Sequence, residues 1–498
     1  MRTLLQRIYR EKTGKAHWPA WPFLMITATF MVGEVLVSHA ETVICGSITA
    51  NSVWSAGASP FIVTCPIVVP KGVMLTIQPG VQVRFKRRLS LKVDGALVAQ
   101  GTEPDPVLFT SNAETPYPGD WGGVSFSEHS VPATYDEADQ YRGGSVLQFA
   151  IFQFGGSSGR VGLLEIRGPG PYIEHVVIQK NAASAIMIDK GTVRIRRSLL
   201  QSNSNSQAFG GGILAFSSTV FVEDSMIRNN PTSGSGGGVH VADSSVVIRN
   251  SSLVQNETAG NGGALFATDS TVSIDQSVFR KNGTPLRGGA VYAARSKVLV
   301  KHSLFQDNMT LRSATQGAPS VGGNQVIMGA GLFVTDSELT VTHSRFLRNK
   351  AEHDCGAMAV VNSTLTLTGN ILSENVSAGD GAALCLEGMA EGSLLSYNTI
   401  ASNRSEKVAL PNIIYLRSGP WPAFVQNNIS DNNGYDLVND SPLMIQAGNN
   451  WWGTTDEGAI RARIYNRSLD GRKGDVLISP PLTAPVTVPS DPTCCQQE

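Results

Sequence analysis

Residues 262–287, GGALFATDSTVSIDQSVFRKNGTPLR, contain three short runs in which apolar and polar side chains alternate, separated by polar corners. Alternation with a period of two is typical of β-strands that bury one face. Small-residue pairs open this unit and six others, and the spacings between successive pairs are 26, 26, 26, 41, 26 and 26 residues. The pairs are Gly210-Gly211, Gly236-Gly237, Gly262-Gly263, Gly288-Gly289, Gly329-Ala330, Cys355-Gly356 and Gly381-Ala382. A repeat with one fixed period predicts a solenoid.

Several positions in every unit are apolar throughout the repeat, so we expect their side chains to point inward. The first run contributes Ile213, Val239, Leu265, Val291, Leu332, Met358 and Leu384, and the second contributes Val220, Val246, Val272, Val298, Leu339 and Leu365. The third contributes Ile227, Leu253, Phe279, Phe305, Phe346 and Leu372. Runs this short bury a face only when units stack, which places identical positions about 4.8 Å apart. The predicted fold is an all-β parallel β-helix with three-strand coils of 26 residues.

Two polar residues also recur at the corners. Serine occupies one position at 218, 244, 270, 296, 337 and 363, and asparagine occupies another at 230, 256, 282, 308, 349 and 375. Asparagines repeated at a turn can adopt left-handed or bridging backbone angles and hydrogen-bond to their counterparts in neighbouring coils. We therefore expect ladders of serine and asparagine along the solenoid.

The sequence around the repeat suggests four segments. Residues 1–40 are predicted to be a signal peptide, because a basic start precedes an apolar stretch and small residues ahead of a cut before Glu41; an uncleaved anchor is the alternative. Residues 41–170 are interpreted as an N-terminal cap with irregular coils, 171–452 as the regular β-helix, and 453–498 as a C-terminal cap and tail. Within these segments, residues 126–143 and 309–328 read as insertions, and a short helix is expected around 457–465.

Composition narrows the partners and the compartment. The chain has 498 residues with 39 basic and 40 acidic side chains, which argues against a nucleic-acid partner. After removal of the leader, no segment is apolar enough to predict an integral membrane domain. The six cysteines lack zinc-site spacing; Cys45 with Cys65 and Cys355 with Cys385 are candidate disulfides in an oxidising compartment, or else free buried thiols.

The repeat resembles known families. GGAL, GGAV and GGVH, with FRKN (279–282), FQDN (305–308) and FLRN (346–349), resemble repeats of the polymorphic outer membrane protein family over residues 200–385. VPKGVMLTIQPGVQVRF, GDWGGVSF and NNWWGT are similar to bacterial proteins of the pectin-lyase-like superfamily over nearly the whole mature chain. The resemblance implies a right-handed, single-stranded parallel β-helix. It also implies a surface adhesin, as in the first family, or an enzyme that cleaves polysaccharides.

One corner position offers a candidate catalytic constellation. Asp243, Asp269 and Arg295 occupy it in successive units, and stacking would place the two carboxylates about 5 Å apart, as in retaining glycosidases. Two like charges so close would raise the pKa of one carboxyl, as a general acid requires. The alternative is that the aspartates cap the turn and Arg295 offsets their charge.

A candidate ligand-binding surface lies on the outward side of the first strand. His240, Phe266, Tyr292 and Phe333 share one position there, following Leu214. A climbing stripe of aromatic rings is typical of surfaces on which sugars stack, and a contiguous exposed apolar patch indicates a partner. The alternatives are stacking of the rings on one another or cover by the 309–328 insertion.

Three weaker candidates complete the search for sites. Asp136, Glu137 and Asp139 are candidate Ca²⁺ ligands, the only cofactor suggested, or a solvated acidic insertion. Arg84, Lys86, Arg87 and Arg88 form a basic patch for anionic glycans, or ordinary surface charge. His302 and His343 are expected to stack, but no third ligand accompanies them, so no metal site is predicted.

These observations lead to a functional hypothesis. We expect an exported, non-catalytic β-solenoid that serves surface or extracellular recognition or adhesion and binds cell-surface or extracellular glycans. The alternative is a polysaccharide lyase or glycoside hydrolase acting on extracellular glycans through Asp243, Asp269 and Arg295. A scaffold that only displays loops is the third possibility.

Overall fold

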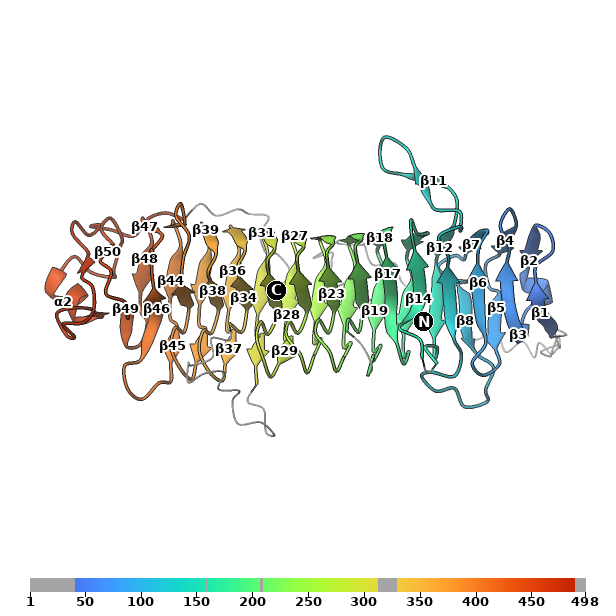
Figure 1. Cartoon of the computed structure of the whole chain (residues 1–498), viewed down its shortest axis with the longest axis horizontal. Helices are drawn as coiled ribbons and strands as arrows, with labels where there is room; N and C mark the ends of the chain where they lie inside the picture. Colours follow the sequence, from blue (N-terminus) through green and yellow to red (C-terminus); the bar gives the residue numbers. More distant parts are fainter. Residues whose placement is uncertain (1–40, 158, 207–208, 312–328, 489–498) are drawn as a thin grey trace, which may run out of the picture.

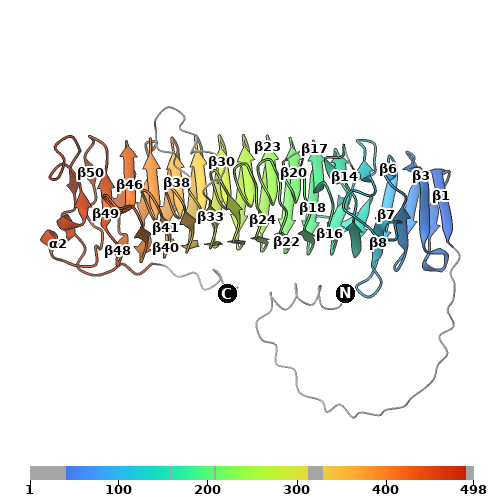
Figure 2. The same ribbon diagram turned by 90° about the horizontal axis from the view of Figure 1, so that it is seen from below.

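The computed structural model describes residues 41–488 except 158, 207–208 and 312–328. The predicted signal peptide, most of the second insertion and the end of the tail lie outside the described residues. The chain winds into a parallel β-solenoid of about 15 turns, with about 26 residues per turn. Figure 1 and Figure 2 show a straight rod with β1 (Thr42–Ser47) at one end and α2 (Glu457–Ala462) at the other. The predicted fold class is confirmed.

Each regular coil contributes one strand to each of three parallel sheets. The first sheet includes β20 (Ile213–Phe216), β23 (Val239–Ala242), β26 (Leu265–Thr268), β30 (Val291–Ala294), β34 (Leu332–Thr335), β38 (Met358–Val361) and β42 (Leu384–Glu387). The second includes β21 (Thr219–Glu223), β24 (Ser245–Arg249), β27 (Thr271–Asp275), β31 (Lys297–Lys301), β35 (Glu338–Thr342) and β39 (Thr364–Thr368). The third includes β22 (Met226–Arg228), β25 (Ser252–Val254), β28 (Val278–Arg280), β32 (Leu304–Gln306), β36 (Arg345–Leu347) and β40 (Ile371–Ser373). These sheets position every candidate site along the rod.

A further short sheet joins the third strand of one coil to the first strand of the next. It consists of β29 (Gly283–Thr284), β33 (Met309–Thr310), β37 (Lys350–Ala351), β41 (Val376–Ser377) and β45 (Arg404–Ser405). Repeated small residues make the adjoining turns possible. A Cβ atom on Gly263 would lie 2.2 Å from the carbonyl oxygen of Gly289 in the next coil. The glycine pairs that reveal the repeat are therefore required by close approach of neighbouring backbones.

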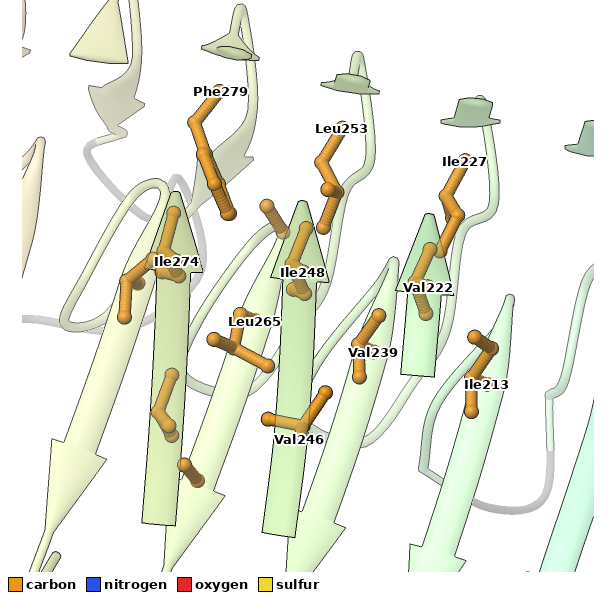
Figure 3. Close-up of a cluster of buried hydrophobic side chains, with 14 of the residues drawn as sticks. Ile213, Val222, Ile227, Val239, Val246, Ile248, Leu253, Leu265, Ile274 and Phe279 are labelled. Atoms are coloured by element: carbon orange, nitrogen blue, oxygen red, sulfur yellow. The ribbon is translucent and has the colours of Figure 1, made fainter. Parts of the chain in front are cut away.

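The predicted core positions face inward and lie over one another. Val272 is in register with Val246 below it and Val298 above it, and all three side chains are buried. Figure 3 shows the same arrangement for Ile213, Val239 and Leu265 of the first sheet. Full burial of one such side chain stabilises the fold by about 1.5–3 kcal/mol. Because each short strand gains this burial only from its neighbours, the core depends on stacking.

Both predicted ladders are present. The backbone amide of Ser244 donates to the hydroxyl of Ser270 at 3.1 Å, and the side-chain amide of Asn256 donates to Asn282 Oδ1 at 3.2 Å. The ladder asparagines themselves are absent from the left-handed region; Gln255, the residue before Asn256, has φ of 54°. The left-handed alternative of that prediction is wrong, because the turn places its left-handed residue one position earlier.

One further ladder, which the sequence did not lead us to predict, runs along the second corner. Serines form it at positions 198, 225, 251, 277, 303 and 344. Asparagines continue that line at positions 370, 398, 427 and 450. The sequence contains a pattern that could have predicted this ladder, because serine recurs every 26 residues at positions 225, 251, 277 and 303.

Pairing and covalent links secure both ends of the described rod. Strand β1 pairs with β3 (Phe61–Val69), and a disulfide joins Cys45 to Cys65 between them. At the other end, the Asp456 carboxylate caps the predicted helix α2 by accepting from two of its backbone amides. A second disulfide, Cys355–Cys385, joins adjacent coils, so both predicted pairings are confirmed. Among the described residues, no helix has the length and apolar character needed to cross a membrane.

Candidate functional site

The insertion at 126–143 forms a hairpin that folds back on the second sheet. Strands β10 (Thr134–Tyr135) and β11 (Tyr141–Gly143) are antiparallel and project from the rod (Figure 1). The Tyr141 ring stacks on Tyr172 of β15 (Tyr172–Glu174), with centroids 5.4 Å apart. The Asp139 carboxylate pairs with Arg194 at 2.9 Å and Arg196 at 3.0 Å, both on β18 (Thr192–Arg196). A nonrepetitive segment is thereby fixed over the regular coils.

A cavity of about 200 Å³ lies beside this hairpin, and we call it the hairpin pocket. Every lining residue carries a polar or charged side chain. They are Gln140, Tyr172, Glu174, Arg196, Arg197, Glu223, Asp224, Arg249 and Asn250. The volume is below the range of about 300–1,000 Å³ typical of drug-sized ligands. The hairpin pocket therefore suits one small polar unit, such as a single sugar residue.

Charges within the hairpin pocket are largely paired with one another. Arg196 Nε donates to Glu223 at 2.7 Å, and Arg197 donates to Glu174 at 2.9 Å. Burial tends to lower the pKa of Arg196, but the hydrogen bonds and charges of Glu223 and Tyr172 together outweigh it, so the pKa is raised and the guanidinium stays charged. Arg249 is half exposed and has only a loose contact, 3.7 Å, with Glu223. Its guanidinium retains donors for a ligand.

The hairpin pocket lies at one end of a row of alternating charge. Successive coils place Glu174, Arg196, Glu223, Arg249, Asp275 and Lys301 in register on the outward side of the second sheet. Opposite charges next to one another keep the local net charge near zero, so this surface does not select polyanions by field alone. Paired guanidinium and carboxylate groups still offer donors and acceptors in fixed positions. Such an arrangement is suited to hydroxyl-rich ligands.

The predicted aromatic stripe exists as a continuous stack. Ring centroids are 4.7 Å apart for His240–Phe266, 5.1 Å for Phe266–Tyr292 and 5.3 Å for Tyr292–Phe333. His240 and Phe333 are only 5% and 4% exposed, whereas the other two rings are partly exposed. The expectation of an open aromatic face is wrong at those two positions, because the rings cover one another and the connecting turns cross them. Cover by residues 312–328 lies outside the described part.

Burial changes the chemistry of the histidine in that stack. Desolvation lowers the pKa of His240 to about 4, and its Nδ1 lies 3.2 Å from the carbonyl oxygen of Ser235. The ring is therefore neutral near pH 7 and acts as a stacking element.

At the candidate catalytic corner, Arg295 makes two 2.7 Å hydrogen bonds to the Asp269 carboxylate. Those bonds lower the pKa of Asp269, which is the opposite of what a general acid requires. Asp243, Asp269 and Arg295 all have positive φ, between 48° and 51°, a conformation that aspartate tolerates better than most residues. The observed geometry supports the interpretation of a turn with offset charge.

The remaining candidates are also engaged with neighbours. The carboxylates of Asp136 and Asp139 pair with arginines, so these two predicted Ca²⁺ ligands are already neutralised, while Glu137 is exposed. His302 and His343 stack as predicted, with centroids 5.7 Å apart. In the described part of the chain, no group of three or more His, Cys, Asp or Glu side chains is arranged to hold a metal ion.

The sequence analysis missed the hairpin pocket and its lining. The alternating charges at 223, 249, 275 and 301 recur at the repeat period and were visible in principle. Gln140 and Tyr172 were not, because the pocket forms only when an insertion without repeat character folds over the regular coils.

Comparison with known proteins agrees with this architecture. Residues 46–157 match a family model described as a pectate-lyase like beta helix domain, and residues 162–327 match one described as a right handed beta helix region. No curated protein matches the chain. The chain is thus a right-handed parallel β-helix, and its residues 46–157 are similar to a pectate-lyase like domain. Neither model describes polymorphic outer membrane protein repeats, so that resemblance stays a prediction.

Proposed function

We propose that this right-handed β-helix chain is an exported recognition protein that binds a glycan in the hairpin pocket without cleaving it. The observation that carries the proposal is the pocket itself, in which charged groups are paired with one another and arranged around a volume suited to one sugar residue. Sugar hydroxyls are both donors and acceptors, so they bind well to preformed guanidinium–carboxylate pairs. The two disulfides support export, because such bonds persist in oxidising compartments.

Two features support binding over catalysis. The strongest catalytic candidate, Asp269, is held by Arg295 with a lowered pKa. In the hairpin pocket, the Glu174 carboxylate accepts from Arg197 and Gln148, and Glu223 accepts from Arg196. Carboxylates held by donors in this way fix a geometry, and their oxygens are already engaged with protein donors.

A glycan array followed by calorimetry on the glycans that bind tests the proposal. Arg249→Ala removes the ligand-facing guanidinium, and we expect the affinity to fall at least about tenfold, since charge-assisted hydrogen bonds are among the strong ones. Arg280→Ala is the matched control, because Arg280 is an exposed arginine of the third sheet away from the pocket. The Arg280→Ala variant should bind the glycan with the same affinity as the unmodified chain.

Other outcomes would overturn the proposal. Binding that survives Arg249→Ala but is lost in Tyr292→Ala would assign the glycan to the aromatic stack. Release of reducing ends or unsaturated products from a bound glycan would make the chain a hydrolase or a lyase. Loss of that turnover in Asp269→Asn would point to the Asp243, Asp269 and Arg295 corner.

A further inference from the structure

A second cavity, of about 470 Å³, is lined by residues close to β1 and on β5 (Gln82–Phe85). Figure 1 shows these strands at the opposite side of the β11 hairpin from the regular coils. We call this cavity the end cavity. It is lined by Glu41, Ala56, Ser59, Pro60, Gly80, Gln82 and Arg84. Its volume lies within the range of about 300–1,000 Å³ typical of small-molecule sites. Hydroxyl, amide, carboxylate and guanidinium groups all reach it.

The arginine of the end cavity is held in place by its neighbours. Strand β5 (Gln82–Phe85) places Gln82 and Arg84 on the same outward face, because side chains two residues apart share a face. Gln82 Oε1 accepts from Arg84 at 2.7 and 3.2 Å, and the Gln82 backbone amide donates to the Ser59 hydroxyl at 2.9 Å. An amide partner orients the guanidinium without neutralising its charge.

Positive charge continues directly beyond Arg84. Lys86, Arg87 and Arg88 form the exposed turn that follows β5. Among the described residues, no carboxylate forms an ion pair with any of these four cations. The neighbouring Asp120 carboxylate is occupied by the Ser111 hydroxyl and the Tyr117 amide, at 2.8 and 2.9 Å. The basic turn follows Arg84 directly in the chain, so three further cations without a carboxylate partner among the described residues come just after the end cavity's arginine.

The charge is concentrated in one coil. The residues in register with Arg84 in the adjacent coils are Ile62 and Thr110, neither of which is charged. A site for a linear polyanion would be expected to repeat its cations along the rod. A compact cluster instead suits one multivalent oxyanion, which arginine binds through several donors at once.

We infer that the end cavity and the basic turn together bind a sugar that carries a phosphate or sulfate ester. The oxyanion is held by Arg84 and the basic turn, while the sugar ring occupies the end cavity and its hydroxyls meet Ser59, Gln82 and Glu41. This site shares no lining residue with the hairpin pocket. It is therefore independent of the proposed function.

Calorimetry and ligand-observed NMR on the full chain test the inference with four probes. These are glucose 6-phosphate, glucose 6-sulfate, glucose and inorganic phosphate. We expect at least one ester to bind at least about tenfold more tightly than glucose or inorganic phosphate, and comparison of the two esters identifies the anion. Arg84→Gln should weaken ester binding at least about tenfold.

A second variant and two controls keep the test decisive. Lys86→Gln/Arg87→Gln alters only the exposed turn and should also weaken ester binding, even if Arg84→Gln disturbs the strand. Arg404→Gln, which changes an exposed arginine paired with Glu406, and Arg280→Gln, which changes an exposed arginine of the third sheet, should leave ester binding unchanged. Equal affinity for inorganic phosphate and the esters, or ester binding unaffected by the turn variant, would overturn the inference.

Discussion

Single buried asparagines decide how the coils of this protein join. Asn282 Oδ1 accepts from both the backbone and the side-chain amide of Asn256, while its own side-chain amide donates to Asn308 and to the carbonyl oxygen of Leu253. A buried polar group left without such partners costs about 1–3 kcal/mol. Each asparagine thus satisfies groups in two neighbouring coils, which explains why it recurs at the repeat period.

At the same scale, His240 makes stability depend on pH. The folded protein keeps this ring neutral down to about pH 4, whereas an unfolded chain takes up the proton near pH 6.5. The contribution of His240 to the free energy of unfolding is therefore complete above about pH 6.5. It is lost as the pH falls to about 4, and the total loss is about 3 kcal/mol. Urea unfolding at pH 7 and pH 4.5 should show a smaller acid loss in His240→Phe than in the unmodified chain. An identical loss in both proteins would contradict the assigned environment.

The burial and contacts of residues that recur in every coil could be predicted from the sequence. The burial and contacts of residues that depend on a single loop could not. The inward valines and the ladder asparagines follow from periodicity alone, because every coil imposes the same requirement on them. His240 and Phe333 share an outward position, which predicted exposure. Their burial results from aromatic neighbours and from connecting turns such as the one carrying Ser235, which alternation within a strand does not describe.

Among the elements, the β10–β11 hairpin has the largest consequence for function. It is an insertion, yet aromatic and charged contacts hold it on the second sheet. The Tyr141 ring stacks on Tyr172, and the Asp139 carboxylate forms ion pairs with Arg194 and Arg196. Without the hairpin, the same coils would present an open strip of paired charges. The element converts a repeated surface into one local pocket.

Asp139→Asn tests that role. The change removes two partly exposed ion pairs, each worth about 0.2–1 kcal/mol, so we expect faster amide hydrogen exchange across residues 134–143 and about threefold weaker glycan binding. The coils themselves should retain their protection. Asp243→Asn, at an exposed corner with a left-handed backbone, serves as the control and should alter neither measurement. Unchanged exchange in the hairpin would show that the aromatic contacts alone hold it.

Elements of the site were less predictable than elements of the fold for a physical reason. The apolar pattern of a strand can be recognised because it recurs in every coil. An insertion such as residues 126–143 occurs once, so no second copy shows which of its residues are buried. Its polar composition predicted a loop, and Asp136 and Asp139 suggested Ca²⁺ binding. Contacts with Arg142, Arg194 and Arg196 show that these carboxylates instead fasten the hairpin.

On the scale of the whole molecule, the rod behaves as a stack in which each coil contacts only its neighbours. Stability is then approximately a sum of coil terms and nearest-neighbour interfaces. Asn261 and Arg287 occupy the same position in successive units, because each immediately precedes a glycine pair. The chain can therefore be joined from Asn261 to Gly288 without changing the register of the repeat. Such a deletion removes one coil and no residue that lines the hairpin pocket or the end cavity.

Removal of residues 262–287 should therefore give a folded rod that is shorter by about 4.8 Å. His240 would stack directly on Tyr292, and Asn256 would meet Asn308. The end cavity would keep its affinity, whereas Lys301 would replace Asp275 beside Arg249 of the hairpin pocket. Deletion of residues 262–274 provides the control, because removing half a coil would place the third-sheet strand β28 where the first-sheet strand β26 belongs. Circular dichroism and small-angle scattering should show a β-rich rod for the first deletion and loss of cooperative folding for the second. If the two deletions were equally tolerated, register between coils would not be what holds the molecule together.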